Sequence, residues 1–229
     1  MNDSHNELRA KARQVHCLLI QVYGLPDRQP QLDPVSQLVN TILSQNTNDK
    51  NRDLAFARLR QRYTTWEEVR DADPAEVIDA IRPAGLANQK GPRIQQALRT
   101  ITHERGELDL SFLADLPMDK AKAWLSSLNG VGPKTAAIVL LFALGKPAFP
   151  VDTHIHRVTK RLGLIGPNVS REKAHAVLEG VLPPDDYFAF HLNVIRHGRE
   201  VCVSRKPRCP ICPLASLCIY YQTTVDRLP

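Results

Sequence analysis

The sequence predicts an all-α protein of about ten helices joined by short turns. Apolar residues recur every three or four positions through most of the 229 residues, and no long alternation with a period of two occurs. An apolar content of 43% with 24% charged residues is typical of a folded chain rather than a disordered one. The chain is long enough for one large or two modest hydrophobic cores.

Several helix ends carry recognisable signals. Asp33-Pro34 and Asp73-Pro74 each place a capping side chain before a first-turn proline. Ser170 is a third start signal, and Gly106 is a stop signal. The stripes that these and neighbouring helices should bury are Val35, Leu38, Val39, Ile42 and Leu43; Val77, Ile78 and Ile81; Ile94, Ala97, Leu98 and Ile101; Trp124, Leu125 and Leu128; and Ala174, Val177 and Leu178.

The charge balance favours a polyanionic partner, since the net charge is +6 and the sequence pI is about 9.2. The longest apolar run, Ala136 to Leu144, is shorter than the roughly 20 residues that a membrane span requires. The N-terminus is too polar for a signal peptide. We therefore expect a soluble, cytoplasmic protein with no membrane partner.

Four cysteines near the C-terminus form a candidate metal site. They are Cys202, Cys209, Cys212 and Cys218, with the spacing C-x6-C-x2-C-x5-C. Soft thiolate ligands at short intervals can hold a tetrahedral zinc ion or an iron–sulfur cluster, and the spacing leaves both open. Two disulfides or four buried thiols are the other interpretations, which are disfavoured because disulfide frameworks belong to secreted chains. Cys17 is interpreted as a core thiol.

A glycine hairpin is predicted over Leu128–Thr135, where the sequence LNGVGPKT separates two apolar segments. Small residues allow close approach of the backbone to a ligand, and Pro133 suits the first position of a helix. The free N–H groups at that helix start suit a phosphate oxygen, so the segment predicts a helix-hairpin-helix that binds a phosphate backbone. An ordinary helix–helix turn is the alternative.

A second basic patch lies between Cys202 and Cys209, where Arg205, Lys206 and Arg208 occur without an acidic residue. Such a patch suits phosphates, although a solvated basic loop is the simpler interpretation.

The hairpin with Lys134, the segment Phe149–His154 that contains Asp152, and the four-cysteine pattern together resemble the endonuclease III family of DNA glycosylases. The resemblance implies a six-helix barrel with the hairpin over residues 26–146. It also implies a discontinuous helical domain over 1–25 and 147–229, in which the four cysteines hold one 4Fe-4S cluster. By the same resemblance, duplex DNA would bind across the cleft between the domains, and the protein would act on it as a monomer at the nucleoid.

The resemblance further implies base excision with abasic-site lyase activity, oxidised pyrimidines being the default substrates. Lys134 would attack the sugar carbon C1′ and form a Schiff base, helped by a helix start that disfavours its ammonium form. Asp152 would stabilise the developing positive charge or help to deprotonate the amine. The simpler interpretations are a phosphate-contacting lysine and an N-cap for the helix that carries Ile155, Val158 and Leu162.

Two loops are expected to handle the space left by an extruded nucleotide. In the loop 44–49, either Gln45 or Asn46 would fill the vacated position, and Leu86 would act as an apolar wedge between bases. A surface turn and a core leucine are the alternatives. The DNA-binding residues implied in all are Gln45, Asn46, Leu86, Gly130, Val131, Gly132, Thr135, Arg205, Lys206 and Arg208.

Two other functions remain open. A monofunctional mismatch glycosylase, acting on uracil or thymine opposite guanine or on adenine opposite oxidised guanine, would use water in place of Lys134. A non-catalytic DNA-binding protein whose metal site senses redox state is the second alternative. Strand cleavage at an abasic site separates either of these from the bifunctional enzyme.

Overall fold

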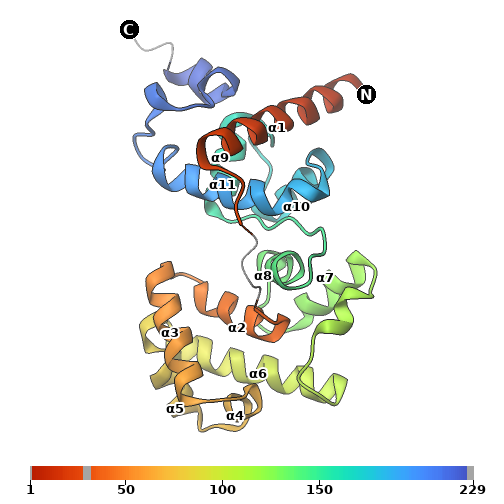
Figure 1. Ribbon diagram of the computed structural model, residues 1–229, viewed down its shortest axis with the longest axis vertical. Coiled ribbons are helices and arrows are strands. Elements are labelled where there is room, and N and C mark those ends of the chain that lie inside the picture. Colours follow the sequence, from red (N-terminus) through yellow and green to blue (C-terminus); the bar gives the residue numbers. More distant parts are fainter. Residues whose placement is uncertain (1, 28–31, 226–229) are drawn as a thin grey trace. The chain divides into compact units, whose positions relative to one another are not determined.

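A computed structural model describes residues 2–27 and 32–225, in which all regular structure is helical (Figure 1). The α-helices are α1 (Asn2–Tyr23), α2 (Pro34–Ser44), α3 (Asp49–Arg62), α4 (Trp66–Asp71), α5 (Pro74–Ala80), α6 (Ala87–Arg105), α7 (Met118–Ser127), α8 (Pro133–Ile138), α9 (Thr153–Leu162), α10 (Arg171–Val181) and α11 (Tyr187–Glu200). No β-strand occurs in these residues, which confirms the predicted all-α class. No helix within the same residues is long and apolar enough to cross a membrane.

The helix ends follow the signals in the sequence. The Asp33 carboxylate accepts a hydrogen bond of 2.9 Å from the Ser36 N–H at the start of α2. The Ser170 hydroxyl accepts one of 3.2 Å from the Lys173 N–H at the start of α10. Gly106, with φ of 81°, ends α6 in the left-handed conformation that glycine adopts most readily. These predicted boundaries are confirmed.

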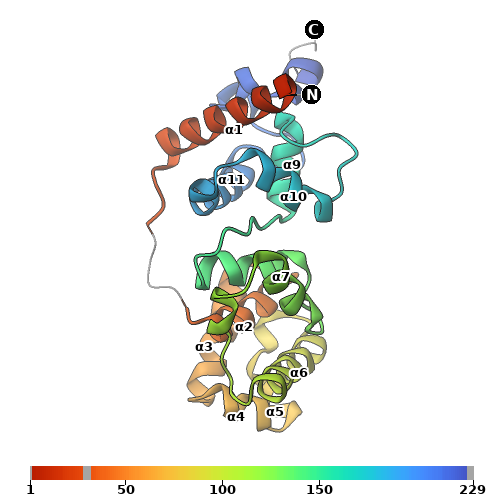
Figure 2. The same ribbon diagram turned by 90° about the vertical axis from the view of Figure 1, so that its right-hand side faces the viewer.

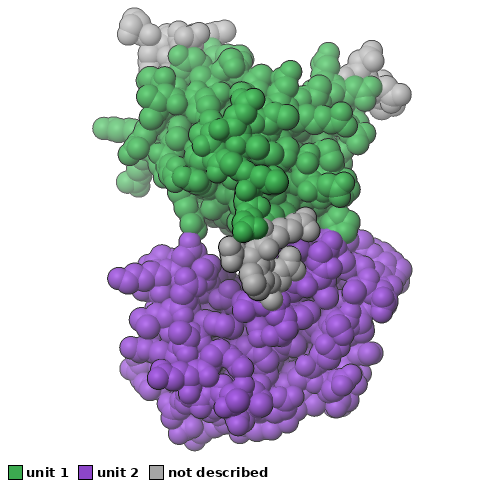
Figure 3. Space-filling view, in the orientation of Figure 1, with its two compact units in different colours: residues 1–29, 147–229 green, residues 30–146 purple. Residues whose placement is uncertain are grey.

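The chain divides into two compact units (Figure 3). Unit 1 comprises residues 1–29 and 147–229, and unit 2 comprises residues 30–146. Unit 1 is therefore discontinuous in sequence, because α1 packs with helices from the C-terminal part of the chain.

The core of unit 2 is built around α6, which contacts α2, α4 and α5. The last two of these pairings can be followed in the lower part of Figure 2. Ile94, Leu98 and Ile101 form the inner face of α6 and are fully buried. Each such side chain stabilises the fold by about 1.5–3 kcal/mol relative to exposure.

The core of unit 1 joins the two ends of the chain. Helix α11 packs against both α1 and α9, and Figures 1 and 2 show the three close together. The Phe149 ring lies 5.4 Å from the Tyr187 ring and 5.9 Å from the Phe190 ring, measured between centroids. The Asn193 side-chain amide donates a 3.0 Å hydrogen bond to the Gly24 carbonyl just after α1. The hydrogen bond joins the end of α1 to α11, and the aromatic rings pack α11 against the segment before α9.

The predicted stripes are buried for the most part, with three half-buried members, Ile78, Trp124 and Val177. The interpretation of Cys17 as a core thiol is wrong, since Cys17 is exposed on α1. The reason is helical geometry: Cys17 stands two positions after the buried Val15, roughly 200° around the helix axis, and therefore faces solvent.

Candidate active site and cysteine centre

The hairpin between α7 and α8 needs a glycine at position 130. Gly130 has a φ of +80°, and a Cβ atom placed on it would lie 2.9 Å from Cδ of Arg93. The turn is closed by a 3.0 Å hydrogen bond from the Val131 N–H to the Leu128 carbonyl, and both of these side chains are buried. The predicted helix-hairpin-helix is confirmed as a tight turn anchored in the core of unit 2.

The start of α8 leaves donors available to a ligand. Gly132 is the N-cap and has no side chain to accept a hydrogen bond from the helix, and Pro133 occupies the first position. Among the described residues, the N–H groups of Lys134 and Thr135 therefore have no capping side chain. Together with the partial positive charge of the helix start, they suit a phosphate oxygen.

Lys134 is half-buried and is the second residue of α8. Within residues 2–27 and 32–225, no side chain forms an ion pair or hydrogen bond with its amine. The amine is thus not committed to another group of the described chain.

The loop after α2 gives Gln45 and Asn46 different environments. The Gln45 side-chain amide donates to the Gly130 carbonyl at 3.0 Å and reaches Oγ1 of Thr135 at 3.4 Å. Asn46 is exposed and has a φ of 52°, a left-handed conformation that is uncommon for a residue other than glycine. Gln45 is therefore a tie to the hairpin, whereas the side chain of Asn46 faces solvent.

Leu86 is not a core leucine. Its side chain is 48% exposed, although an apolar side chain of this size is usually buried. Leu86 has a φ of 52°, and the preceding Gly85 has a φ of 68°, so the chain makes a sharp left-handed bend before α6. The alternative of a buried structural leucine is contradicted.

Asp152 is the N-cap of α9. Its Oδ1 atom accepts a 2.7 Å hydrogen bond from the Ile155 N–H, so the capping interpretation is confirmed. Asp152 is half-buried, and the cap fixes the direction of its carboxylate. Asp152 belongs to unit 1 and Lys134 to unit 2, and their pairing across a cleft stays a prediction.

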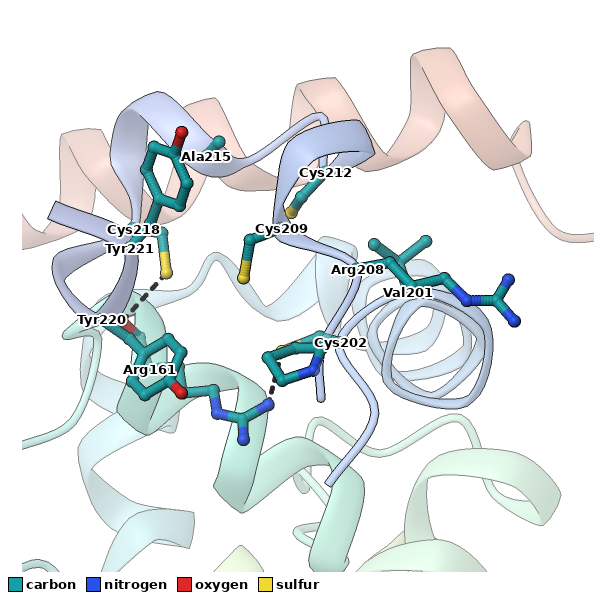
Figure 4. A pocket seen from close by; sticks show the side chains of 11 residues that line it. Arg161, Val201, Cys202, Arg208, Cys209, Cys212, Ala215, Cys218, Tyr220 and Tyr221 are labelled. Carbon is teal, nitrogen blue, oxygen red and sulfur yellow. Dashed lines mark hydrogen bonds between the residues drawn. The ribbon is translucent and has the colours of Figure 1, made fainter. Parts of the chain in front are cut away.

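The four C-terminal cysteines line one pocket of unit 1, together with Arg161 and other residues (Figure 4). Part of this pocket is open to solvent. All four cysteines are free, so the alternative of two disulfides is contradicted. Among the described residues, no three His, Cys, Asp or Glu side chains form a group that could hold a single metal ion. Four free thiols that line one pocket are donors of the type that a zinc ion or an iron–sulfur cluster takes.

Burial favours the neutral thiol at three of the four cysteines. Burial raises the pKa of Cys212 to about 11, and it also raises the pKa of Cys209 and of Cys218. Since the thiolate is the metal ligand, a bound centre must displace these protons. Metal binding should therefore release protons and weaken as the pH falls.

Arg161 of α9 organises the basic loop. Its guanidinium donates to the Val203 carbonyl at 2.8 Å and the Ser204 carbonyl at 3.0 Å, and lies 3.3 Å from Sγ of Cys202 (Figure 4 shows the last contact). The same guanidinium lies over the Tyr220 ring, 4.8 Å from its centroid. Sequence reasoning missed this residue, because only its place on the last turn of an amphipathic helix sets it apart.

The predicted DNA contacts fall into two sets. Unit 2 holds the loop of Gln45 and Asn46, Leu86 and the hairpin residues, and the structure joins the first of these to the hairpin. Unit 1 holds the three basic residues, Arg205, Lys206 and Arg208, which are all exposed.

Comparisons with known proteins agree with this geometry. A family model described as the HhH-GPD superfamily of base excision DNA repair proteins matches residues 39–184. Endonuclease III of Sulfolobus acidocaldarius is 36% identical over 192 residues, 83% of this chain and 83% of the relative. Endonuclease III of Thermotoga maritima is 34% identical over 201 residues, 88% of this chain and 90% of the relative. A solved structure of a trapped endonuclease III–DNA covalent intermediate has a TM-score of 0.78 and 28% identity, and covers 93% of this chain and 97% of that chain.

The all-helical fold, the glycine hairpin and these matches define a DNA glycosylase of base excision repair with a helix-hairpin-helix. The chain belongs to the endonuclease III family, which confirms the resemblance drawn from its three motifs.

The contacts of Arg161 predict the behaviour of an Arg161→Met variant. Loss of its charged donors should free the basic loop, so trypsin should cut after Arg205 and Arg208 about tenfold faster or more, as expected for hydrogen bonds from a charged group. Time-resolved proteolysis followed by mass spectrometry measures the rates. Arg171→Met, at an exposed position on α10, is the control and should leave the rates unchanged. Equal rates in Arg161→Met and wild type would contradict the role assigned to Arg161.

Proposed function

We propose that the protein excises damaged bases, chiefly oxidised pyrimidines, from duplex DNA and then cleaves the strand at the abasic site through a Schiff base on Lys134. The observation that carries the proposal is the half-buried Lys134 amine, which no side chain of the described residues engages, at the start of the helix after the hairpin. A relative solved as a covalent intermediate with DNA supports a covalent route.

Lys134 would act in its neutral form. The amine nitrogen bonds to C1′ of the sugar, the glycosidic C1′–N bond breaks, and its electron pair leaves with the base, which takes up a proton. Loss of a proton from the bound nitrogen and opening of the sugar ring give the Schiff base. Removal of a proton from C2′ then expels the 3′ phosphate, and water releases the lysine.

Asp152 would serve as the carboxylate beside C1′. The positive charge that develops on the sugar as the base leaves is stabilised by a nearby anion, and the same group can accept the proton of the amine. The hydrogen bond to the Ile155 N–H engages Oδ1, and a carboxylate has further lone pairs for this second task. A fixed cap also keeps the group from rotating away.

Asn46 is the residue that we assign to the space of the extruded nucleotide. The Gln45 amide already donates to the hairpin, so insertion of Gln45 would break that tie, whereas Asn46 is exposed. Leu86 would enter the stack as a wedge, because it presents an exposed apolar side chain on a bend.

The four cysteines would hold one 4Fe-4S cluster. The four free thiols that line one pocket support a soft-metal centre, and membership of the endonuclease III family favours a cluster over a single zinc ion. The cluster would supply a rigid structural anchor for the chain around it. Arg161 would hold the basic loop against that anchor, and Arg205, Lys206 and Arg208 would contact DNA phosphates, with the protein acting as a monomer.

A panel of duplexes, each with one lesion and one opposite base, tests the substrate assignment. We expect release of oxidised pyrimidines with strand cleavage. Activity confined to uracil or thymine opposite guanine, or to adenine opposite oxidised guanine, without strand cleavage would support a monofunctional enzyme. Duplex binding without any excision would support a non-catalytic protein.

Borohydride reduction should trap a covalent complex between the wild-type protein and a damaged duplex, because it reduces the Schiff base to a stable amine. Lys134→Ala should form no adduct, and Lys120→Ala, at an exposed position of α7, should form the wild-type amount. Denaturing gel electrophoresis measures the adduct. A full yield from Lys134→Ala would remove Lys134 as the nucleophile.

Asp152→Asn should lower base excision by about 10²- to 10⁴-fold, the range of a lost acid–base group. Asparagine caps helices as well as aspartate does, so the melting temperature and duplex affinity should stay close to wild type. Asp73→Asn makes the same exchange at the N-cap of α5 and should retain full excision. Single-turnover kinetics measure each rate, and wild-type excision by Asp152→Asn would exclude Asp152 from the mechanism.

Purified protein should be brown, with broad visible absorption and equal amounts of iron and acid-labile sulfide. Cys209→Ser should lose the absorption and the iron, since it removes one ligand, whereas Cys17→Ser should keep both because Cys17 is an exposed thiol of α1. Metal analysis together with the visible spectrum measures the outcome. A colourless protein with stoichiometric zinc would overturn the cofactor assignment.

A further inference from the structure

Lys90 of α6 is a buried cation outside the residues that the proposed chemistry uses. It is 1% exposed, and no other fully buried side chain of the described residues belongs to a lysine. Burial lowers the pKa of Lys90, because the ammonium loses its contact with water. Such a group persists in a core only where its donors have partners.

The Lys90 amine has two hydrogen-bond partners, and each is a backbone carbonyl just before a different loop. It donates a 2.8 Å hydrogen bond to the Leu43 carbonyl at the end of α2 and another of 2.8 Å to the Ala84 carbonyl. Leu43 comes just before the loop of residues 44–49, and Ala84 just before the Gly85–Leu86 bend. The same nitrogen atom is thus hydrogen-bonded to the backbone immediately before each of the two loops.

Both loops hold a strained residue that needs such support. Asn46 and Leu86 each have a φ of 52°, a left-handed conformation that is unfavourable for most residues other than glycine. Conformations of this kind persist where several surrounding contacts hold the backbone in place. The carbonyls that Lys90 binds lie two or three residues before each strained position.

A second polar tie extends the connection. The Gln45 amide donates to the Gly130 carbonyl of the hairpin, so the loop of residues 44–49 is held on one side by Lys90 and on the other by the hairpin. An apolar side chain in place of Lys90 would fill the space but would remove the donor of two buried carbonyls, which destabilises both segments.

We propose that Lys90 is a positioning residue that fixes the two loops relative to each other, so that Asn46 and Leu86 enter the base stack together; this rests on the proposed glycosylase function. Lys90 does not touch DNA. It acts through the Leu43 and Ala84 carbonyls on the two residues that do.

The test compares Lys90→Met with Lys146→Met. Lys146 is in the same unit, and its amine also donates to two backbone carbonyls, Ala114 at 2.6 Å and Leu116 at 2.8 Å, which belong to neither loop. The control therefore removes the same kind of tie and costs stability without disturbing Asn46 or Leu86. Assays are run well below the melting temperature of each protein.

The first readout is fluorescence from a duplex with 2-aminopurine opposite a tetrahydrofuran abasic analogue, at saturating protein. Wild type and Lys146→Met should raise the fluorescence, because the inserted side chains unstack the 2-aminopurine. Lys90→Met should bind this duplex with a much smaller rise. A full rise with Lys90→Met, or no rise with wild type, would overturn the proposal.

The second readout is the ratio of two rates, excision of a damaged base from a duplex and strand cleavage at a preformed abasic site. Lys90→Met should lower the ratio by about ten- to a hundredfold, as misplaced groups do, and placing the lesion in an unpaired bubble should restore it. Lys146→Met should leave the ratio unchanged, and an unchanged ratio in Lys90→Met would contradict the positioning role. If Lys90→Met does not fold, Lys90→Gln, with a shorter donor, replaces it and should show the same losses to a smaller degree. Absence of excision by wild type on every lesion would instead defeat the proposed function.

Discussion

Backbone groups at the ends of helices have no partner inside the helix, and this constraint locates the candidate functional residues of the protein. Gln45 is the C-cap of α2, Leu86 precedes the first residue of α6, Lys134 is the second residue of α8, and Asp152 is the N-cap of α9. The helix interiors supply the two cores. Reactive and recognition groups therefore stand on short segments whose direction is set by rigid helices on either side.

Long cationic side chains stabilise the irregular backbone between these helices. Lys90 donates to two carbonyls in unit 2, and Arg161 donates to two carbonyls of the basic loop in unit 1. The Val203 and Ser204 carbonyls lie in a loop, whereas the Leu43 and Ala84 carbonyls lie at helix ends, where the last carbonyls lack intrahelical donors. In both places a side chain from another helix satisfies them. Each loop is thereby linked by hydrogen bonds to a helix of its own unit.

The cysteine pocket differs from these loops, because its side chains are candidate metal ligands. Its thiols are free, and burial keeps Cys209, Cys212 and Cys218 in the neutral form until a cation replaces their protons. A centre held in this way couples the folding of the C-terminal segment to metal binding. Arg161 contacts both Cys202 and the loop that follows it, so a single side chain links the cysteine pocket to the basic loop.

Local signals in the sequence were sufficient for much of the fold. Capping by Asp33 and Ser170 depends on hydrogen bonds between residues three positions apart. Such contacts can be predicted from a short stretch of sequence. The exposure of Leu86 could not be predicted in this way, because an apolar residue at helical spacing is normally expected to be buried. Its exposure follows from the left-handed bend at Gly85 and Leu86, which comes directly after the Ala84 carbonyl that Lys90 binds.

By itself, the sequence determined the all-helical class, the glycine hairpin with its lysine, the capping aspartate and the set of four thiols, because each depends on residues close together in the chain. The tertiary structure decided which of Gln45 and Asn46 is free and what holds the basic loop. Gln45 is tied to Gly130, 85 positions away, and Arg161 to Val203, 42 positions away. Such contacts depend on packing between segments distant in the chain, which no local pattern encodes.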